Sequence, residues 1–480
     1  MKLAGQKTKI VATIGPASES REIMEGMINA GMNVARLNFA YGDPDSHTQV
    51  INTLRTAARS TGRRIAVMAD LPGPKIRIGR LAHEPVELQP GFPFTLTTRD
   101  IVGDAERVSV SLRSLPQVLK PGDTLFLNDG IIQLLTLKIE GEEVLCRVVI
   151  GGELRSHKGL NLPGIDLGIR AFTQRDREWL EFASARGVDA VSQSFVESAA
   201  DIIAVREAAA AMGYHPYIIA KIERSQALEH IDGILEAADG IMVARGDLGV
   251  EIPIEKIALV QKRLINRANS LGKPVITATQ MLESMTDNRR PTRAESTDVA
   301  NAVLDGTDCV MLSAESALGS YPVEAVAMLA KIAAAAEPYR VRHDLMEALR
   351  NGDKKGSATI TDVIALNVET ALERISPAAI FVPTRSGLMA RSIARFKPPV
   401  WIVAVSSSEE TCQRLLFSSG VYPVYEPDHP QNWNAYVKDW LSHHALEGNF
   451  AILTEGPSRA HPGANHRMEI IRLNREGNKE

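Results

Sequence analysis

The segment IIAKIERSQALEHIDGILEAADGIMVARGDLG, residues 218–249, has the pattern of a strand, a helix, a second strand and a charged loop. Side chains in a strand alternate between two faces, so Lys221 and Glu223 share one face of the first strand. Asp247 follows the second strand directly. Two carboxylates and an ammonium at neighbouring strand ends suit a divalent cation beside a phosphorylated substrate. The alternative is a buried Lys221–Glu223 ion pair, with Asp247 as an ordinary helix cap.

The alternation of strands and helices extends on both sides of this segment. Earlier strands are expected at 8–15, 34–39, 65–71 and 189–195, and later ones at 274–280 and 308–313. Between 72 and 167 the pattern changes to short period-two runs separated by Pro-Gly, Gly-Asp and Gly-Glu turns. Counted across this insert, eight strands each followed by a helix predict an α/β fold, a (β/α)₈ TIM barrel. An open doubly wound sheet is the alternative.

Three domains are therefore expected. Residues 1–71 and 168–345 would form the catalytic barrel, and 72–167 a β-rich lid inserted after its third strand. A second α/β pattern predicts a C-terminal domain over 346–480, a candidate effector domain. The polar stretch NGDKKGS, residues 351–357, is expected to be the linker.

Composition limits the classes of function. Hydrophobic residues make up 44% and charged residues 23% of the chain, as in ordinary globular proteins. The net charge of -4 favours neither a nucleic-acid nor a membrane partner. The three cysteines are widely spaced without a CxxC motif, which predicts neither disulfides nor a zinc site. No signal peptide or membrane span is expected, so we predict a cytoplasmic protein.

The carboxyl ends of the barrel strands are where such a fold places its chemistry. Cations there can neutralise phosphate oxygens, and the N–H groups of Gly246 and Asp247 can hold a carboxylate at a helix N-terminus. The motifs GxxxxGK[ST], GxGxxG, HExxH and GxSxG are absent. The polar residues at or just beyond these ends are Arg36, Asn38, Asp70, Lys75, Arg77, Lys221, Glu223, Asp247, Thr277, Thr279, Ser313 and Glu315.

Long blocks of this sequence resemble the pyruvate kinase family over nearly the whole chain. They include KIVATIGPAS (9–18), GMNVARLNF (31–39), GPKIRIG (73–79), AKIE (220–223), VARGDLGVE (243–251) and ATQMLESM (278–285). The chain looks like a bacterial member with Lys in place of Glu in the GPEIR motif. The resemblance implies phosphoryl transfer from phosphoenolpyruvate to ADP, giving pyruvate and ATP, with Mg²⁺ or Mn²⁺, in a homotetramer.

The resemblance also implies roles for individual residues. Glu223 and Asp247 match the metal ligands, and Lys221 matches the lysine that stabilises charge on the moving phosphoryl group and the enolate oxygen. Arg36 matches the arginine that binds the phosphate, and Thr279 matches a threonine at the substrate near the path of proton delivery. Gly246 and Asp247 belong to the expected substrate site. The nucleotide side is expected to comprise Arg77, Lys158, Asn38 and Tyr41.

The chain departs from the family at the site that holds K⁺ in members that need this ion. Asn38 and Asp70 are retained, but Ala40 lacks the expected hydroxyl and Leu71 stands where a Thr is usual. We expect the ammonium of Lys75 to supply the missing positive charge and the enzyme to be independent of K⁺. The alternative is that Lys75 pairs with a surface carboxylate.

The segment PTRSG, residues 383–387, resembles the effector loop of the family. Its residues Thr384, Arg385, Ser386 and Gly387 are a candidate seat for a sugar phosphate. An ordinary glycine-containing turn capped by Ser386 is the alternative.

Two other functions fit part of the pattern. One is a Mg²⁺-dependent barrel enzyme that makes or breaks a carbon–carbon bond in phosphoenolpyruvate or pyruvate. The other is a non-enzymatic metabolite sensor acting through the C-terminal domain. Formation of ATP from ADP and phosphoenolpyruvate would separate both from a kinase.

Overall fold

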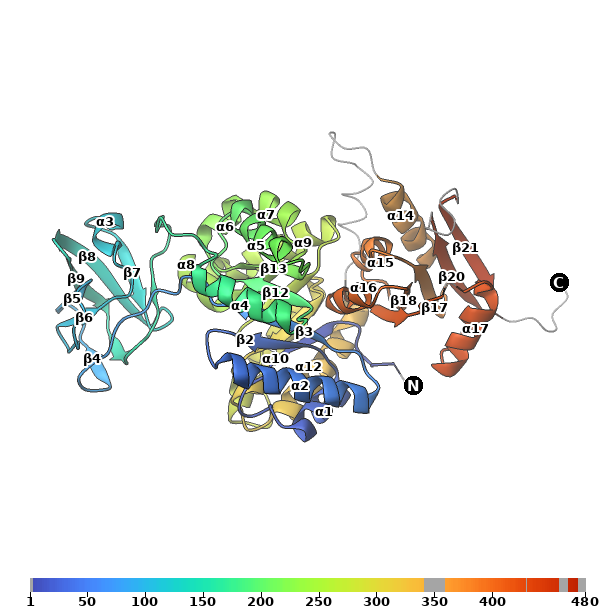
Figure 1. Cartoon of the computed structure of the whole chain (residues 1–480), viewed down its shortest axis with the longest axis horizontal. Coiled ribbons are helices and arrows are strands. Elements are labelled where there is room, and N and C mark those ends of the chain that lie inside the picture. Colours follow the sequence, from blue (N-terminus) through green and yellow to red (C-terminus); the bar gives the residue numbers. More distant parts are fainter. Residues whose placement is uncertain (1–2, 341–358, 429, 457–464, 474–480) are drawn as a thin grey trace.

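The computed structural model describes residues 3–340, 359–428, 430–456 and 465–473. The expected linker at 351–357 and the expected boundary at 345 lie outside these ranges. Three parts follow one another along the long axis of the molecule, with a helix-wrapped barrel in the middle (Figure 1). The exact domain boundaries stay a prediction.

The central part is a closed barrel of parallel strands, as predicted, and not an open sheet. Neighbours around the barrel run in the order β1-β16-β15-β14-β13-β12-β3-β2. These strands are β1 (Lys9–Thr13), β2 (Met32–Asn38), β3 (Ala66–Leu71), β12 (Ala190–Gln193), β13 (Tyr217–Ile222), β14 (Gly240–Ala244), β15 (Val275–Ala278) and β16 (Cys309–Leu312).

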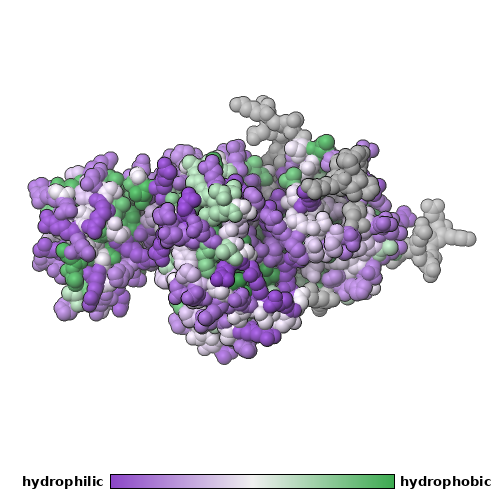
Figure 2. Space-filling model, in the orientation of Figure 1, coloured by the Kyte–Doolittle hydropathy of each residue, from purple (hydrophilic) through white to green (hydrophobic). Residues whose placement is uncertain are grey.

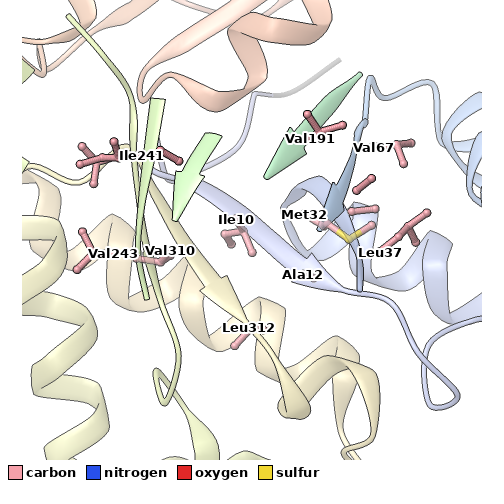
Figure 3. Packing of buried hydrophobic residues seen from close by; sticks show 14 of the residues in the cluster. Ile10, Ala12, Met32, Leu37, Val67, Val191, Ile241, Val243, Val310 and Leu312 are labelled. Atoms are coloured by element: carbon pink, nitrogen blue, oxygen red, sulfur yellow. The ribbon is translucent and has the colours of Figure 1, made fainter. Parts of the chain in front are cut away.

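Helices surround the barrel because the outward-facing side chains of its strands are apolar. Figure 3 shows Ile10, Ala12, Val67, Val243 and Leu312 within the layer packed between strands and helices. Strands buried on both faces read as nearly continuous apolar runs. The helices are α1 (Arg21–Ala30), α2 (Pro44–Thr61), α4 (Gln174–Ala185), α5 (Ala199–Ala211), α6 (Ser225–Glu229), α7 (Ile231–Ala237), α8 (Arg245–Glu251), α9 (Ile257–Ser270), α10 (Arg293–Leu304), α11 (Ala314–Ala317) and α12 (Pro322–Ala336), with short 3₁₀ turns η1 (Ile254–Lys256), η2 (Glu283–Thr286) and η3 (Glu337–Tyr339).

Local sequence signals set the ends of α2. Asp43 accepts a hydrogen bond from the backbone N–H of Ser46, and Pro44 occupies the first turn, where its missing N–H costs nothing. Gly62 ends the helix in a left-handed conformation, at a φ of 65°.

The insert after β3 is a separate β-rich region, as predicted, and its one helix in the described chain, α3 (Leu115–Val118), has four residues. It projects from the barrel at one end of the molecule (Figure 1). A six-stranded sheet has the order β11-β7-β8-β9-β5-β6, and β10 pairs with β4. The strands are β4 (Val86–Leu88), β5 (Pro93–Thr97), β6 (Arg107–Ser109), β7 (Thr124–Leu127), β8 (Ile132–Glu140), β9 (Glu143–Ile150), β10 (Gly152–Leu154) and β11 (Leu160–Asn161).

The C-terminal part is an α/β domain, as predicted. Its sheet has the order β19-β18-β17-β20-β21, with β21 antiparallel to β20. The strands are β17 (Ala379–Pro383), β18 (Trp401–Ser406), β19 (Val421–Tyr425), β20 (Phe450–Glu455) and β21 (Arg467–Arg472); the helical elements are α14 (Ile360–Leu372), α15 (Leu388–Ala394), α16 (Glu409–Arg414), η4 (Leu415–Phe417) and α17 (Trp433–His443).

The short turn η4 closes the amino-terminal end of the barrel. Leu416 and Phe417 belong to the same buried cluster as the inward-facing residues of the strands. The Phe417 ring lies 5.5 Å from the Tyr217 ring, and the Cys309 thiol donates a hydrogen bond of 3.3 Å to the Phe417 carbonyl oxygen. The C-terminal domain therefore contributes part of the barrel core.

The face of the molecule shown in Figure 2 is largely hydrophilic, with scattered hydrophobic areas. Among the described residues, no helix has both the length and the apolar character needed to cross a membrane.

Replacing Phe417 with Ala is expected to destabilise the protein by about 3–5 kcal/mol, because a fully buried ring is removed and leaves a cavity in the barrel core. Phe92→Ala makes the same change at a ring that is 64% exposed, and is expected to cost less than about 0.5 kcal/mol. Urea unfolding of both variants measures the difference. Equal losses would show that η4 is not part of the barrel core.

Candidate active site

Lys221 lies at the carboxyl end of β13, and its ammonium group is surrounded by oxygen atoms. Nζ is 2.6 Å from the hydroxyl oxygen of Ser194, 3.4 Å from Oδ1 of Asp70 and 3.4 Å from Oε2 of Glu223. The side chain is only 12% exposed. A cation this deeply buried needs such partners, since its hydration is lost.

Asp70, at the end of β3, is shared by two cations. Its Oδ2 accepts a hydrogen bond of 3.0 Å from Nε of Arg36 and a second, short bond from Nη2 of the same side chain. Its Oδ1 accepts a hydrogen bond of 2.6 Å from the Ser192 hydroxyl. Arg36 also donates to the Thr13 hydroxyl over 2.9 Å. The guanidinium is therefore held in one orientation beside Lys221.

The pKa values follow from these contacts. Burial alone would raise the pKa of Asp70, but the charges of Lys221 and Arg36 outweigh it and lower this pKa to about 2. Burial lowers the pKa of Lys221, and Asp70 with Glu223 more than reverse this effect, so the pKa lies above its usual value. Both side chains are charged at neutral pH.

Glu223 is the carboxylate of this group that has an oxygen atom without a hydrogen bond. Its Oε1 accepts a hydrogen bond of 2.7 Å from the backbone N–H of Phe195, a residue in the left-handed region at a φ of 58°. Its Oε2 is buried and has no hydrogen-bond partner among the described residues. Burial raises the pKa of Glu223, and nearby Asp247 adds to this rise. Such an oxygen is suited to a cation.

A divalent cation fits these residues. Glu223 and Asp247 supply hard oxygen atoms, and Asp247 is half-buried in the first turn of α8. Within the described chain, no group of three or more His, Cys, Asp and Glu residues could hold a metal. Mg²⁺ is commonly bound by one or two carboxylates, with substrate oxygens and water completing its shell.

The start of α8 is fixed against the end of β15. The backbone N–H of Gly246 donates to the Thr279 hydroxyl over 2.8 Å, and Thr279 has a φ of 67°. The Arg245 guanidinium donates to the carbonyl oxygens of Ala278, over 3.2 Å, and Thr279, over 2.7 Å, and pairs with Asp298 at 2.6 Å. Arg245 thus stabilises a backbone conformation that a Thr rarely adopts.

Of the residues predicted for the nucleotide side, Arg77 and Lys158 lie in the insert, and Asn38 and Tyr41 lie at and beyond the end of β2. Nη1 of Arg77 donates to the His157 carbonyl oxygen over 2.9 Å, next to the half-buried Lys158. Tyr41 is 66% exposed, and Oδ1 of Asn38 accepts from the backbone N–H of Ala40 over 3.1 Å. These groups are not joined to one another by any described contact.

The comparisons with known proteins agree on one family. The descriptions "Pyruvate kinase, barrel domain" and "Pyruvate kinase, alpha/beta domain" match residues 5–326 and 362–471. The chain belongs to the pyruvate kinase family. A pyruvate kinase of Thermococcus litoralis is 51% identical over 88% of this chain and 89% of its own, and one of Geobacillus stearothermophilus is 42% identical over 97% and 80%. A crystal structure of a pyruvate kinase from Cryptosporidium parvum has a TM-score of 0.90 at 35% identity, covering 98% of this chain and 97% of its own.

Lys75 is the residue at which this member of the pyruvate kinase family was expected to replace K⁺. Its side chain is exposed and runs beside Gly159, where an added Cβ would lie 3.6 Å from Cε of Lys75. No contact within the described chain joins it to Asp70 or Asn38. Asp70 is instead paired with Arg36 and Lys221.

Part of the candidate effector loop is hydrogen-bonded within the protein. The Thr384 hydroxyl accepts from the backbone N–H of Gly387 over 2.9 Å, and the Arg385 carbonyl oxygen accepts from the Thr411 hydroxyl over 2.6 Å. The Ser386 carbonyl oxygen accepts from Arg391 over 3.1 Å. The side chains of Arg385 and Ser386 are exposed, and the role of this loop stays a prediction.

Sequence reasoning gave no role to four residues that hold the site: Ser192, Ser194, Thr13 and Arg245. Ser192 and Ser194 alternate at the end of a buried strand, so the period-two argument that found Lys221 would also have found them.

Thr277 and Glu315 were grouped with the site, but Thr277 binds the Thr307 hydroxyl at 2.9 Å and Glu315 accepts from the backbone of Leu282 and Ser313.

Asp70→Asn is expected to reduce the free energy of unfolding at pH 6, and the loss should shrink at low pH. The folded pKa of about 2 lies below the ordinary value of 3.8 for an Asp side chain, so the charged carboxylate stabilises the fold above pH 4 and this contribution disappears as pH falls toward 2. Between pH 6 and pH 3, the gap between the wild type and the variant should narrow by about 1 kcal/mol in urea unfolding. A gap that is constant with pH would contradict the assigned pKa.

Proposed function

We propose that this chain transfers the phosphoryl group of phosphoenolpyruvate to ADP, giving pyruvate and ATP, with Mg²⁺ or Mn²⁺ bound by Glu223 and Asp247. Membership of the pyruvate kinase family supports the reaction. The observation that carries the proposal is the placement of Arg36, Lys221 and Glu223 at one end of the barrel: Asp70 pairs with Arg36 and Lys221, and Lys221 pairs with Glu223. Phosphoryl transfer depends mainly on positioning and charge neutralisation, which such a group provides.

Different groups of the site would bind the different anionic parts of the substrate. Arg36 faces the phosphate oxygens, and the ammonium of Lys221 neutralises charge on the transferred group and on the enolate oxygen. The backbone N–H groups of Gly246 and Asp247 orient the carboxylate, and Thr279 stands near the carbon that accepts the proton. A divalent cation, when bound, would supply Lewis-acid stabilisation of the phosphate and enolate oxygens.

The insert would act as the lid. Arg77 and Lys158 supply cations for the phosphates of ADP, with Asn38 and Tyr41 on the barrel side. Closing the lid over the rim would exclude water, which otherwise competes with ADP for the phosphoryl group. A carbon–carbon lyase has no need of this second set of phosphate contacts, and a sensor has no need of Lys221.

Lys221→Met is expected to lower kcat at least about 10³-fold in a coupled assay of pyruvate formation from phosphoenolpyruvate and ADP, because the cation at the reacting oxygens is lost. Lys273→Met is the matched control, since Lys273 is also a part-buried lysine but donates to the Ala238 carbonyl oxygen at the opposite end of the barrel. Its kcat should stay within about twofold. Wild-type protein that binds phosphoenolpyruvate but forms no ATP would exclude the kinase.

We also propose that activity is independent of K⁺. Ala40 cannot supply a hydroxyl ligand, Oδ1 of Asn38 is occupied by a backbone N–H, and both oxygens of Asp70 accept hydrogen bonds. Lys75 lies near the start of the lid segment, and its side chain runs beside Gly159, the residue after Lys158. We further propose that the protein is a homotetramer, which the family supports. We also propose that it is cytoplasmic, which the buried free thiols of Cys146, Cys309 and Cys412 support.

In tetramethylammonium buffer, added KCl is expected to change the wild-type kcat by less than about twofold, whereas Lys75→Glu should lower it in a way that KCl partly restores. The charge removed at Lys75 is the charge that K⁺ would replace. Arg80→Glu, a charge reversal at an exposed residue of the same segment, is the control. Strong activation of the wild type by KCl would refute the proposal.

A further inference from the structure

Arg224 is a buried cation that the proposed reaction does not use. It follows Glu223 directly, two residues beyond the end of β13. Only 4% of the side chain is exposed. The cost of burying a guanidinium requires compensation by specific partners.

The first partner belongs to the segment by which the chain returns from the lid to the barrel, residues 162–171, called here the return segment. Nη2 of Arg224 donates a hydrogen bond of 2.9 Å to the carbonyl oxygen of Ile165. The Ile165 side chain packs against the hydrophobic core of the lid. Arg224 therefore ties the base of the lid to the rim of the barrel.

Two carboxylates hold the guanidinium in this orientation. Oε1 of Glu197 lies 3.4 Å from Nη2, and Oε2 of Glu251 lies 3.6 Å from Nε. Glu251 is the last residue of α8, and its Oε1 is buried with no hydrogen-bond partner among the described residues. Its Oε2 also accepts hydrogen bonds of 3.3 and 3.2 Å from the N–H and hydroxyl of Ser225.

Each of these contacts leads to a different part of the site. Glu251 is the last residue of α8, and Gly246 and Asp247 lie in the first turn of the same helix. Glu197 follows Phe195, whose N–H holds Glu223, by two residues. Ile165 leads to the lid residues that would meet ADP. Arg224 therefore links the lid, helix α8 and the segment after β12 whose Phe195 N–H binds Glu223.

We propose that Arg224, clamped between Glu197 and Glu251, is a positioning residue that fixes the return segment and so presets the lid for ADP. This inference rests on the proposed function for its ligand. Arg224 touches no reacting atom; it lowers the conformational cost of bringing Arg77 and Lys158 over the rim.

The test compares Arg224→Met, Arg224→Lys and a control, Arg206→Met. Arg206 also donates to a carbonyl oxygen, that of Ala237, and pairs with a carboxylate, Asp239, but at the other end of the barrel. We expect Arg224→Met to raise KM for ADP about tenfold, the value of one charged hydrogen bond, with less than about a threefold change in kcat and in KM for phosphoenolpyruvate. Arg224→Lys keeps the charge but not the planar fork, so it should restore the melting temperature more fully than KM for ADP.

Amide hydrogen exchange on the same unliganded proteins gives a second readout. Backbone amides of residues 164–168 should exchange faster in both Arg224 variants and at the wild-type rate in Arg206→Met. If Arg224→Met lowers kcat or the melting temperature while KM for ADP and this exchange stay unchanged, the role is structural and the inference is wrong. If the wild type forms no ATP, the proposed function fails, and exchange alone decides whether Arg224 anchors the return segment.

Discussion

The contact of Lys221 with Asp70 is the interaction on which the site depends. Both groups are nearly inaccessible to water, so each charge depends on the oppositely charged groups around it. Arg36 adds a second cation beside Asp70, and Glu223 adds a second carboxylate beside Lys221, so two cations and two carboxylates meet at the rim. Each charge in this costly place lies beside one of opposite sign, as the burial of ionised groups requires.

The barrel makes this cluster possible because its register brings strand ends to one level. Asp70 pairs in register with Asn38 of β2 and with Ser192 of β12, and Lys221 comes from the strand beyond β12. Side chains far apart in sequence therefore meet without any loop having to be ordered. The rim also contains backbone in the left-handed region at Phe195 and Thr279, which the Glu223 carboxylate and the Arg245 guanidinium contact directly. Such conformations persist where surrounding contacts over-determine them.

Much of the fold could be predicted from the sequence, since strand and helix periods, turn residues and the break after β3 are local signals. The same period of two placed Lys221 and Glu223 on one face. The prediction that Thr277 belongs to the site was wrong, because β15 ends at Ala278 and Thr277 lies within the strand, where its hydroxyl binds Thr307. That Arg36, Ser192 and Lys221 all pair with Asp70 could not be found in this way, since this pairing depends on the register between neighbouring strands. The linkage of Arg224 to Ile165 likewise depends on how the lid returns to the barrel.

The two ends of the barrel show how a structural carboxylate differs from one suited to a ligand. At the amino-terminal end, Asp308 accepts from Lys397 at 2.7 Å, from the Ser419 N–H at 2.9 Å and from the Val275 N–H at 3.2 Å, under the cover of η4. Both of its oxygens are satisfied, so it fastens the C-terminal domain and can bind little else. At the carboxyl end, Glu223 keeps one buried oxygen without a hydrogen bond, close to the ammonium of Lys221. An unsatisfied buried oxygen costs folding free energy, of the order of 1–3 kcal/mol, which binding of a cation would recover. The asymmetry between the two carboxylates therefore favours cation binding at the lid end, while the carboxylate at the opposite end holds the fold together.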